Sequence, residues 1–350
     1  MDLLDNLDQP GVVEVAGVPK YELASCSVCK RTDHSAYLMR KEGYDLYKCT
    51  ECQHIFVWPI PTIEELKHIY SSASSYQVQD KTIYDDNTVI GEKACESLKQ
   101  IESYCRRRGR LLDVGCSSGK FLWHAKRNGW RSVCGVELNE DTAQIANDNQ
   151  LGVSVGELAC AGYPPSSFDA IHLGDVIEHV QDPTALLAHA SGLLESDGVM
   201  LLVTPNHDAL FPFLTFWLYR LFRMPWSHAT PPHHLNQFSD KSLHKILENV
   251  NLRVISKQYR GCDLLYELGE THVLRSFRHA LRERQLALAA GRLVLAAFTI
   301  VGYAVAYGID RCCIWKKKDF EMRYVVRKSS YCWQPYESVR QAKCQATGVV

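Results

Sequence analysis

The sequence has almost no net charge and lacks the features of several protein classes. Its 39 basic and 40 acidic side chains leave a formal charge of −1, which disfavours binding to nucleic acid over a wide surface. It shows no internal repeat and no low-complexity tract, so no repeat architecture is indicated. The first residues are acidic and lack the basic and apolar regions of a signal peptide. We therefore expect a cytoplasmic protein whose 14 cysteines are thiols and metal ligands rather than disulfides.

Four of these cysteines form two closely spaced pairs near the N-terminus. Cys26-x-x-Cys29 and Cys49-x-x-Cys52 are separated by 19 residues, an interval typical of a four-cysteine zinc ribbon. Each pair can direct two thiolates toward one point, and the four thiolates of two pairs form a tetrahedron around Zn²⁺. Because so short a segment buries little core by itself, the metal would supply its folding energy. Four sulfur ligands leave no open position, so we predict a structural rather than a catalytic site.

The other prominent motif is Leu111-Leu-Asp-Val-Gly-Cys-Ser-Ser-Gly-Lys-Phe-Leu122, in which an apolar run ends in an acid and a tight glycine turn follows. In an α/β sheet this strand would deliver Asp113 to its carboxyl end, while Gly115 and Gly119 let backbone approach a ligand at a helix N-terminus. The glycine spacing is Gly-x-x-x-Gly and differs from the Gly-x-Gly-x-x-Gly of dinucleotide sites. The motif predicts a nucleotide-cofactor pocket and disfavours an NAD-dependent oxidoreductase.

Strand-like and helix-like stretches alternate after this motif, which is typical of a doubly wound parallel sheet. We predict an α/β fold with a seven-stranded Rossmann-like sheet beside the small zinc ribbon. The predicted strands are Leu111–Val114, Ser132–Glu137, Val153–Val155, Ala170–Leu173, Val199–Thr204, Leu252–Tyr259 and Met322–Lys328.

Acidic residues and a histidine gather where the predicted fourth strand ends. Gly174 and Asp175 lie at the carboxyl end of this strand, where ligands bind in open sheets. If residues 176–180 start a short helix, Asp175, Glu178 and His179 lie within one turn of each other. Such a cluster can hold a divalent cation near Glu178 or supply a base, and it can equally be a network that caps the turn.

Together these motifs resemble the class I S-adenosylmethionine (SAM)-dependent methyltransferases. The resemblance rests on the 111–122 motif, on Gly-Val-Glu-Leu-Asn, on Phe-Asp-Ala-Ile-x₃-Asp-Val-Ile-Glu-His-Val-x-Asp-Pro and on Leu-Leu-Val-Thr-Pro-Asn, and it covers roughly residues 90–330. Ser117 stands where the family usually has its middle glycine, and it is small enough to keep the loop. The resemblance implies an enzyme that transfers a methyl group from SAM.

In the SAM pocket that the resemblance implies, Asp113 faces the amino-acid end of the cofactor. Glu137 ends the second strand, where a carboxylate can grip ribose hydroxyls. Glu157 follows the third strand and would approach the adenine; the alternative for both glutamates is a solvated acid at a strand end. The predicted cofactor-binding residues are Asp113, Gly115, Cys116, Gly119, Glu137, Leu138, Glu157, Leu158 and Gly174.

A second resemblance concerns the acceptor. A zinc ribbon joined to this domain, with the sequence Pro-His-His-Leu-Asn-Gln-Phe-Ser at 232–239, is similar to bacterial methyltransferases of sugar and polysaccharide pathways. Nucleotide-sugar C-methyltransferases among these have a His-Leu-x-x-Phe-Ser element whose histidine acts as base, and His234 falls on that position. Ubiquinone-type O-methyltransferases also show the Glu-His-Val sequence, and their metal-binding acids would fall near Asp175, Glu178 and His179. We predict His234, His179 and Asp175 as catalytic residues.

Two apolar stretches lie apart from these motifs. Residues 207–226 are unusually aromatic and follow the predicted fifth strand, so we expect a flap over the acceptor or an ordinary packed helix. Residues 293–309 approach the length of a membrane span. A single crossing would separate the strands predicted at 252–259 and 322–328, so we expect a buried or interfacial helix instead. Either stretch would then mediate peripheral contact with the inner face of the membrane, and 293–309 could also form a homodimer contact.

The predicted organisation is a leader (1–20), the zinc ribbon (21–60), a helical linker (61–110), a SAM-binding domain (111–280) with a lid insertion (207–238), a hydrophobic helical insertion (281–321), the last strand (322–330) and a tail (331–350). We predict C- or O-methylation of a small-molecule acceptor, with sugar or lipid-linked compounds favoured. The alternatives are a catalytically silent SAM-fold scaffold whose zinc ribbon binds a partner, and a ubiquinone-type O-methyltransferase acting on a membrane-resident phenol. A nucleic-acid methylase is disfavoured because the ribbon has no basic stretch.

Overall fold

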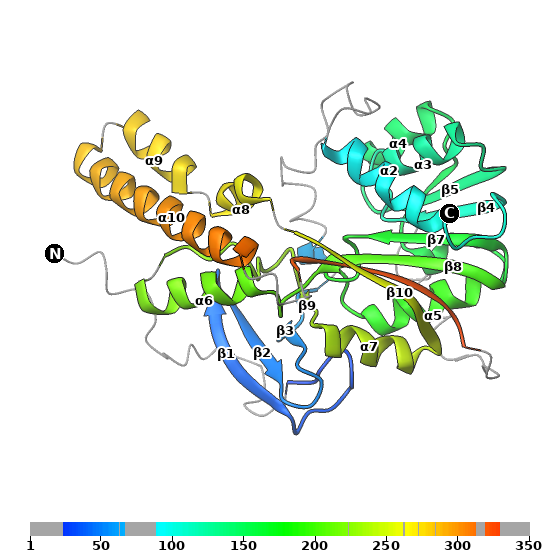
Figure 1. Ribbon diagram of the computed structural model, residues 1–350, viewed down its shortest axis with the longest axis horizontal. Helices are drawn as coiled ribbons and strands as arrows, with labels where there is room; N and C mark the ends of the chain where they lie inside the picture. The colour runs from blue at the N-terminus through cyan, green and yellow to red at the C-terminus, as the bar shows by residue number, and fades with distance from the viewer. Residues whose placement is uncertain are drawn as a thin grey trace.

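The computed structural model describes residues 24–62, 64–66, 89–222, 224–261, 263–271, 273–283, 285–312 and 319–329. The expected leader at 1–20 and tail at 331–350 lie outside the described residues. The chain forms a large sheet between two layers of helices, a small sheet, and a group of helices that projects to one side (Figure 1).

The large sheet contains seven strands in the order β10-β11-β8-β7-β4-β5-β6. All pairings are parallel except those of β11, which runs antiparallel to both of its neighbours. The predicted α/β fold and its seven strands are thus confirmed. The strands are β4 (Arg110–Val114), β5 (Ser132–Glu137), β6 (Val153–Val155), β7 (Phe168–Gly174), β8 (Leu194–Pro205), β10 (Leu252–Arg260) and β11 (Glu321–Lys328).

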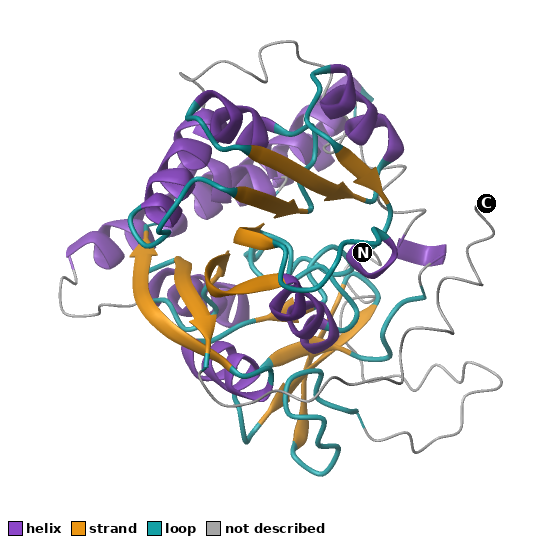
Figure 2. Cartoon of the chain, turned by 90° about the vertical axis from the view of Figure 1, so that its right-hand side faces the viewer, coloured by secondary structure: helices purple, strands orange, loops and turns teal. Residues whose placement is uncertain are grey.

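Helices cover both faces of this sheet (Figure 2). Successive residues of a strand point to opposite faces, so Leu111 joins one hydrophobic cluster and Leu112 the other. The cluster of Leu111 includes residues of α2 (Val89–Glu102), α3 (Lys120–Arg127) and α4 (Glu140–Asp148). The cluster of Leu112 includes residues of α5 (Pro183–Leu193) and α7 (Asp240–Asn249). The sheet order reverses at β4, and open α/β sheets bind ligands at the carboxyl ends of the strands where such a reversal occurs.

The small sheet joins the cysteine-containing segment to a distant part of the chain. Its order is β1-β2-β3-β9, with β1 (Ser35–Lys41), β2 (Tyr44–Cys49) and β3 (Ile55–Val57) close in sequence and β9 (Asn236–Gln237) far from them. Cys26, Cys49 and Cys52 belong to the same hydrophobic cluster as Leu112. The ribbon is therefore packed on the α5 and α7 face of the large sheet rather than held apart from it.

The projecting group contains α6 (Leu210–Phe222), α8 (Leu264–Glu270), α9 (Val273–Arg282) and α10 (Leu286–Cys312). Within α10, residues Leu288–Cys312 are long and apolar enough to cross a membrane, and most of this stretch is exposed. The expectation of a buried helix at 293–309 was therefore wrong, whereas an interfacial helix remains consistent. β10 and β11, the strands that precede α8 and follow α10 in the chain, pair antiparallel in one sheet as expected.

The short helix expected at residues 176–180 is a turn. Asp175 has a left-handed backbone (φ 52°), and the amide of His179 donates to the Val176 carbonyl at 3.0 Å. The carbonyl of Glu178 accepts hydrogen bonds from the amides of Leu235 and Asn236 at 2.8 and 2.9 Å. Because this carbonyl is used across the chain, the turn does not continue as a helix, and the next helix, α5, begins at Pro183.

Candidate functional site

The loop after β4 has three residues in the left-handed region, which brings its backbone close to its surroundings. Gly115, Ser117 and Gly119 have φ of 68°, 49° and 84°. A Cβ atom on Gly115 would lie 2.7 Å from a methyl group of Val176, so no larger residue fits without a shift. A serine is tolerated at the middle position at the cost of a left-handed backbone. The loop ends at the N-terminus of α3, where amides can receive a ligand.

Asp113 forms a buried pair with a histidine that sequence reasoning did not assign. The two residues are register partners on β4 and β7, and His172 Nδ1 donates to Asp113 Oδ1 at 2.7 Å. The imidazole also stacks on Phe121, with 4.1 Å between ring centres. His172 Nε2 is buried and has no hydrogen-bond partner among the described residues. The signal that could have revealed His172 was its place on the neighbouring parallel strand, level with Asp113.

The predicted ribose-binding acid also organises the loop. Glu137 Oε2 accepts from the Ser117 amide at 2.8 Å, and its other oxygen accepts from the Asn139 amide at 2.9 Å. Each carboxylate oxygen has a further lone pair, so a ligand hydroxyl can still bind. Leu138 beside it is 56% exposed, so it offers an apolar surface that a ligand could cover.

The other predicted cofactor residues lie around the same edge of the sheet. Leu158 is buried in the helical turn after β6, and Glu157 before it is exposed. Cys116 is buried, and its sulfur packs closely on Gly135 of β5. A Cβ atom on Gly135 would lie only 2.6 Å from this sulfur, so no larger residue fits there without a shift. Gly174 is needed because a Cβ atom there would lie 2.6 Å from the His172 ring. The predicted cofactor-binding residues thus lie along the carboxyl ends of the strands around β4, where the strand order reverses.

The three predicted catalytic residues are only partly brought together. Glu178, His179 and His234 form a group whose ligand atoms all lie within 4.8 Å of one another, and this group does not include Asp175. The rings of His179 and His234 meet edge to face, with centres 4.7 Å apart. His179 Nδ1 donates to the His233 carbonyl at 2.7 Å, which fixes the orientation of its ring. The chain thus joins the turn after β7 to the segment before β9.

Burial determines the charge of this group. It lowers the pKa of His179 to about 4 and that of His234 well below the usual value, so both imidazoles are neutral at pH 7. Burial and the nearby charge of Asp175 raise the pKa of Glu178 well above its usual range. Thr204 donates to Glu178 Oε2 at 2.9 Å, whereas the buried Oε1 has no partner among the described residues. A neutral imidazole can accept a proton, and the group can also offer a nitrogen and oxygen ligand set.

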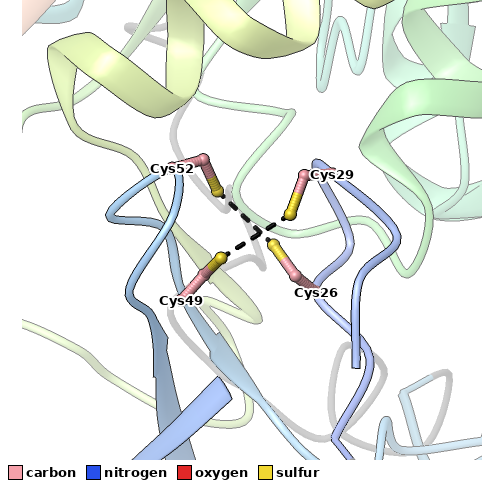
Figure 3. A group of neighbouring side chains, drawn as sticks. All are labelled: Cys26, Cys29, Cys49 and Cys52. Atoms are coloured by element: carbon pink, nitrogen blue, oxygen red, sulfur yellow. Dashed lines mark hydrogen bonds between the residues drawn. The ribbon is translucent and has the colours of Figure 1, made fainter. Parts of the chain in front are cut away.

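The four predicted metal ligands converge (Figure 3). The sulfur atoms of Cys26 and Cys52 are 3.6 Å apart, as are those of Cys29 and Cys49, and all four lie within 4.8 Å of one another. Zn–S bonds of about 2.3 Å at a tetrahedral centre require sulfur separations of about 3.8 Å, which matches this group. The Cys52 thiol donates to Cys26 and lowers the pKa of Cys26 to about 5, while the same contact raises the pKa of Cys52. A bound cation would allow all four thiols to ionise.

A buried polar network joins this cysteine group to the segment that contains His234. Ser27 lies between Cys26 and Cys29, and its hydroxyl donates to Asn236 Oδ1 at 2.7 Å. The Asn236 side-chain amide in turn donates to the Val180 carbonyl at 2.7 Å, and His54 Nε2 donates to Asn236 Oδ1 at 3.0 Å. The cysteine group thus supports both segments that bear the histidine pair, a role that the sequence did not reveal for Asn236.

Two further histidines near this region predict how stability depends on pH. Burial lowers the pKa of His207 to about 4 and that of His228 to about 3. The pKa values of these histidines in the folded protein lie below the ordinary 6.5. At pH values between the folded and the ordinary pKa, the unfolded chain therefore binds more protons than the folded protein. Stability is therefore fully present above about pH 6.5 and is expected to fall as the pH drops toward 4, by about 1.4 kcal/mol per pH unit for each histidine.

Urea denaturation of the protein and of His228→Gln between pH 7 and 4 measures this effect. Carboxylates and the cysteine group also titrate in acid, so the informative quantity is the difference between the two slopes. The variant should have the shallower slope, and equal slopes would contradict the assignment.

Comparison with known proteins places these features in context. Residues 87–257 match the model of a family described as a methyltransferase domain. The chain is 28% identical over 137 residues to a ubiquinone biosynthesis O-methyltransferase of Neisseria meningitidis serogroup C, covering 37% of this chain and 55% of that protein. It is 34% identical over 106 residues to the protein of that name from Xanthomonas euvesicatoria pv. vesicatoria, covering 28% and 43%. The chain thus spans about half the length of the curated relatives it matches.

Among solved structures, the fold is similar to that of the [4+2]-cyclase SpnF. The TM-score is 0.50 at 15% identity, and the alignment covers 77% of this chain and 98% of the cyclase. This likeness supports the fold and leaves the chemistry to the residues of the site.

Proposed function

We propose that this chain, whose residues 87–257 match the model of a methyltransferase domain, transfers a methyl group from SAM to a small-molecule acceptor. The observation that supports this most directly is the left-handed glycine loop beside the buried Asp113–His172 pair, at the point where the sheet order reverses. No dinucleotide glycine pattern competes with it in the sequence.

The residues at this edge fit SAM by their chemistry. Gly115 follows a left-handed path and carries no side chain that would keep a ligand from the loop backbone, and Asp113 offers a carboxylate to an ammonium group. The unpartnered Nε2 of His172 and the spare lone pairs of Glu137 offer further polar contacts, and the exposed Leu138 offers an apolar one. SAM, when bound, supplies an electrophilic methyl group. The protein must then hold the acceptor in line with that group and exclude water, which can contribute about 7–11 kcal/mol.

Removal of the acceptor proton is assigned to the histidine pair. His234 is neutral at pH 7, and its ring contacts His179, whose orientation the His233 carbonyl fixes. We therefore infer that His234 accepts the proton and that His179 holds the ring of His234 in place. The alternative is that His179 itself accepts the proton. A positioned base of this kind contributes about 10²–10⁴-fold to the rate.

Replacing His234 with alanine tests this assignment. We expect the initial rate of label transfer from saturating radiolabelled SAM into a fixed cell extract to fall by about 10²-fold or more. SAM affinity, measured by titration calorimetry, should not change. His34→Ala, a partly exposed histidine of the ribbon that contacts Asp33, is the matched control and should keep full activity. Full activity in both His234→Ala and His179→Ala would refute the proposed base.

A divalent cation at Glu178, His179 and His234 is the second candidate for this group. It is favoured by the buried Glu178 Oε1 without a partner among the described residues and by the convergence of the three ligand atoms. This arrangement would suit a ubiquinone-type O-methyltransferase, in which a cation orients a phenol oxygen. Activity that chelation removes and Mg²⁺ restores, with the zinc content of the protein unchanged throughout, would favour the cation, whereas chelation without effect would favour the proton-accepting histidine.

Two chemical classes of acceptor follow from the resemblances. Relatives named as ubiquinone biosynthesis O-methyltransferases match only part of the chain, so a lipid-linked acceptor and a sugar both remain candidates. The alternative of a silent scaffold whose ribbon binds a partner is weakened by the packing of Cys26, Cys49 and Cys52 in the core of the large sheet. Identification of the labelled product distinguishes the acceptors, and the absence of any product despite SAM binding would support the scaffold.

A further inference from the structure

α10 has two stripes of opposite character. One stripe is buried against the rest of the projecting group and consists of Ala289, Ala296, Thr299, Tyr303 and Ala306. These residues recur at intervals of seven, three and four, so they lie on one side of the helix. Gly302 beside them permits close packing, since a Cβ atom there would lie 3.0 Å from the sulfur of Met224.

The opposite stripe is apolar and uncovered. It consists of Val294, Phe298, Val301, Val305 and Ile309, which are 42–62% exposed. We call these five residues the outer stripe. On α6, the residues Phe213, Trp217 and Leu221 recur every four positions and are also 46–66% exposed. A continuous row of large apolar side chains in water is unfavourable and marks a surface that is covered in use.

The charges on these helices indicate what covers the stripe. The described side chains of α6, α9 and α10 include the arginines 220, 278, 282, 292 and 311 and a single acid, Asp310. On α9, the exposed residues Leu274, Arg278, Leu281 and Arg282 follow an i, i+4, i+7, i+8 pattern and so share one face. Apolar side chains interleaved with arginines are typical of a helix that lies in the surface of an anionic bilayer.

The connections of α10 oppose a single crossing of the bilayer. The strands that precede α8 and follow α10 in the chain, β10 and β11, pair along their length in one sheet. Tyr303, in the middle of α10, donates to the Pro225 carbonyl at 3.0 Å and accepts from the Ser227 amide at 2.9 Å. These contacts hold the buried stripe of α10 against the protein, so lipid can reach only the exposed side of the helix, on which the outer stripe lies.

We propose that the projecting group docks on an anionic lipid bilayer, with α10 lying along the surface and its outer stripe entering the apolar layer. Lys41 of the small sheet donates to the carbonyls of Trp226 and His228, so the segment that Tyr303 holds also contacts the ribbon and leads on to His234. On the proposed function, docking would thus bring the histidine pair toward acceptors that reside in the bilayer.

Vesicle flotation tests the docking without reference to methyl transfer. The full chain should float with vesicles of phosphatidylcholine and phosphatidylglycerol and bind weakly to phosphatidylcholine alone. The triple variant Phe298→Glu, Val301→Glu, Val305→Glu should lose at least 10-fold in vesicle affinity. The double variant Arg278→Gln, Arg282→Gln should lose roughly 30-fold in affinity for the anionic vesicles and keep its weak binding to phosphatidylcholine. The reason is that each arginine near an anionic surface contributes about 1 kcal/mol to binding.

Val155→Glu is the matched control. Val155 is 51% exposed on β6, the edge strand farthest from β10 in the large sheet, so the same change there should leave vesicle binding intact. The proposal is overturned if the wild-type chain does not float, or if the triple variant floats as well as the wild type. Resistance to alkaline carbonate extraction would overturn it in favour of a spanning helix. The wild-type chain could instead form a dimer that does not float, and the triple variant could be a monomer. That result would mean that a second copy of the chain, rather than lipid, covers the outer stripe.

Discussion

Cys49→Ser should release the zinc that we propose at the cysteine group and strongly lower the melting temperature of the protein. The reason is that the four sulfurs lie at the separations that tetrahedral zinc requires, and three of the four cysteines are buried in the core of the large sheet. Structural zinc contributes about 10–16 kcal/mol of binding free energy in small domains, and three thiolates hold it far less well than four. Metal content by mass spectrometry and thermal unfolding measure both effects.

The matched control for this change is Cys312→Ser. Cys312 is exposed at the end of α10 and has no part in the metal group, so its replacement should change neither metal content nor melting temperature. Retention of one zinc per chain by Cys49→Ser would show that the group does not bind the metal as inferred.

The same variant also distinguishes two roles for the ribbon. Ser27 and His54 contact Asn236, two residues after His234, so loss of the metal should disturb the histidine pair. The glycine loop is held by hydrogen bonds to the Val136 carbonyl and the Glu137 carboxylate of β5, so SAM binding should survive better than methyl transfer. A ribbon that served only to bind a partner would show the opposite result, with methyl transfer unchanged after metal loss.

Gly115→Val should abolish measurable SAM binding. The new side chain would begin 2.7 Å from a methyl of Val176, in the loop that is proposed to approach the cofactor, and valine is strained at φ 68°. We expect a loss of affinity of about 100-fold or more by titration calorimetry, since the close backbone contact is the basis of the site.

Gly129→Val provides a control for the backbone strain alone. Gly129 has φ 85°, and a Cβ atom there would meet nothing within 4 Å. Both variants should therefore lose the stability that a left-handed valine costs, about 1–2 kcal/mol, and Gly115→Val should lose more because of its clash with Val176. Only Gly115→Val should lose SAM binding. Equal affinity in the two variants would mean that the loop after β4 is not the cofactor site.

The elements that sequence predicted well are those with strong local patterns. The strands at 111–114, 132–137 and 153–155 are short apolar runs ended by turn residues, and the structure places them within a residue of the prediction. The helix expected at 176–180 failed because the Glu178 carbonyl bonds to Leu235 and Asn236, a contact across more than fifty residues that no local pattern contains. The burial of 293–309 was also misjudged, since an apolar run does not state whether other chain segments cover it.

The sequence by itself determined the parallel sheet, the glycine loop and the cysteine pairs, because each depends on residues that are close in the chain and on the backbone freedom or ligand chemistry of those residues. Only the tertiary structure decided that His172 faces Asp113, that His179 meets His234, and that Asn236 ties both segments to the ribbon. These contacts depend on strand register and on the pairing of β9 with β3, which arise when distant segments bury their apolar faces together.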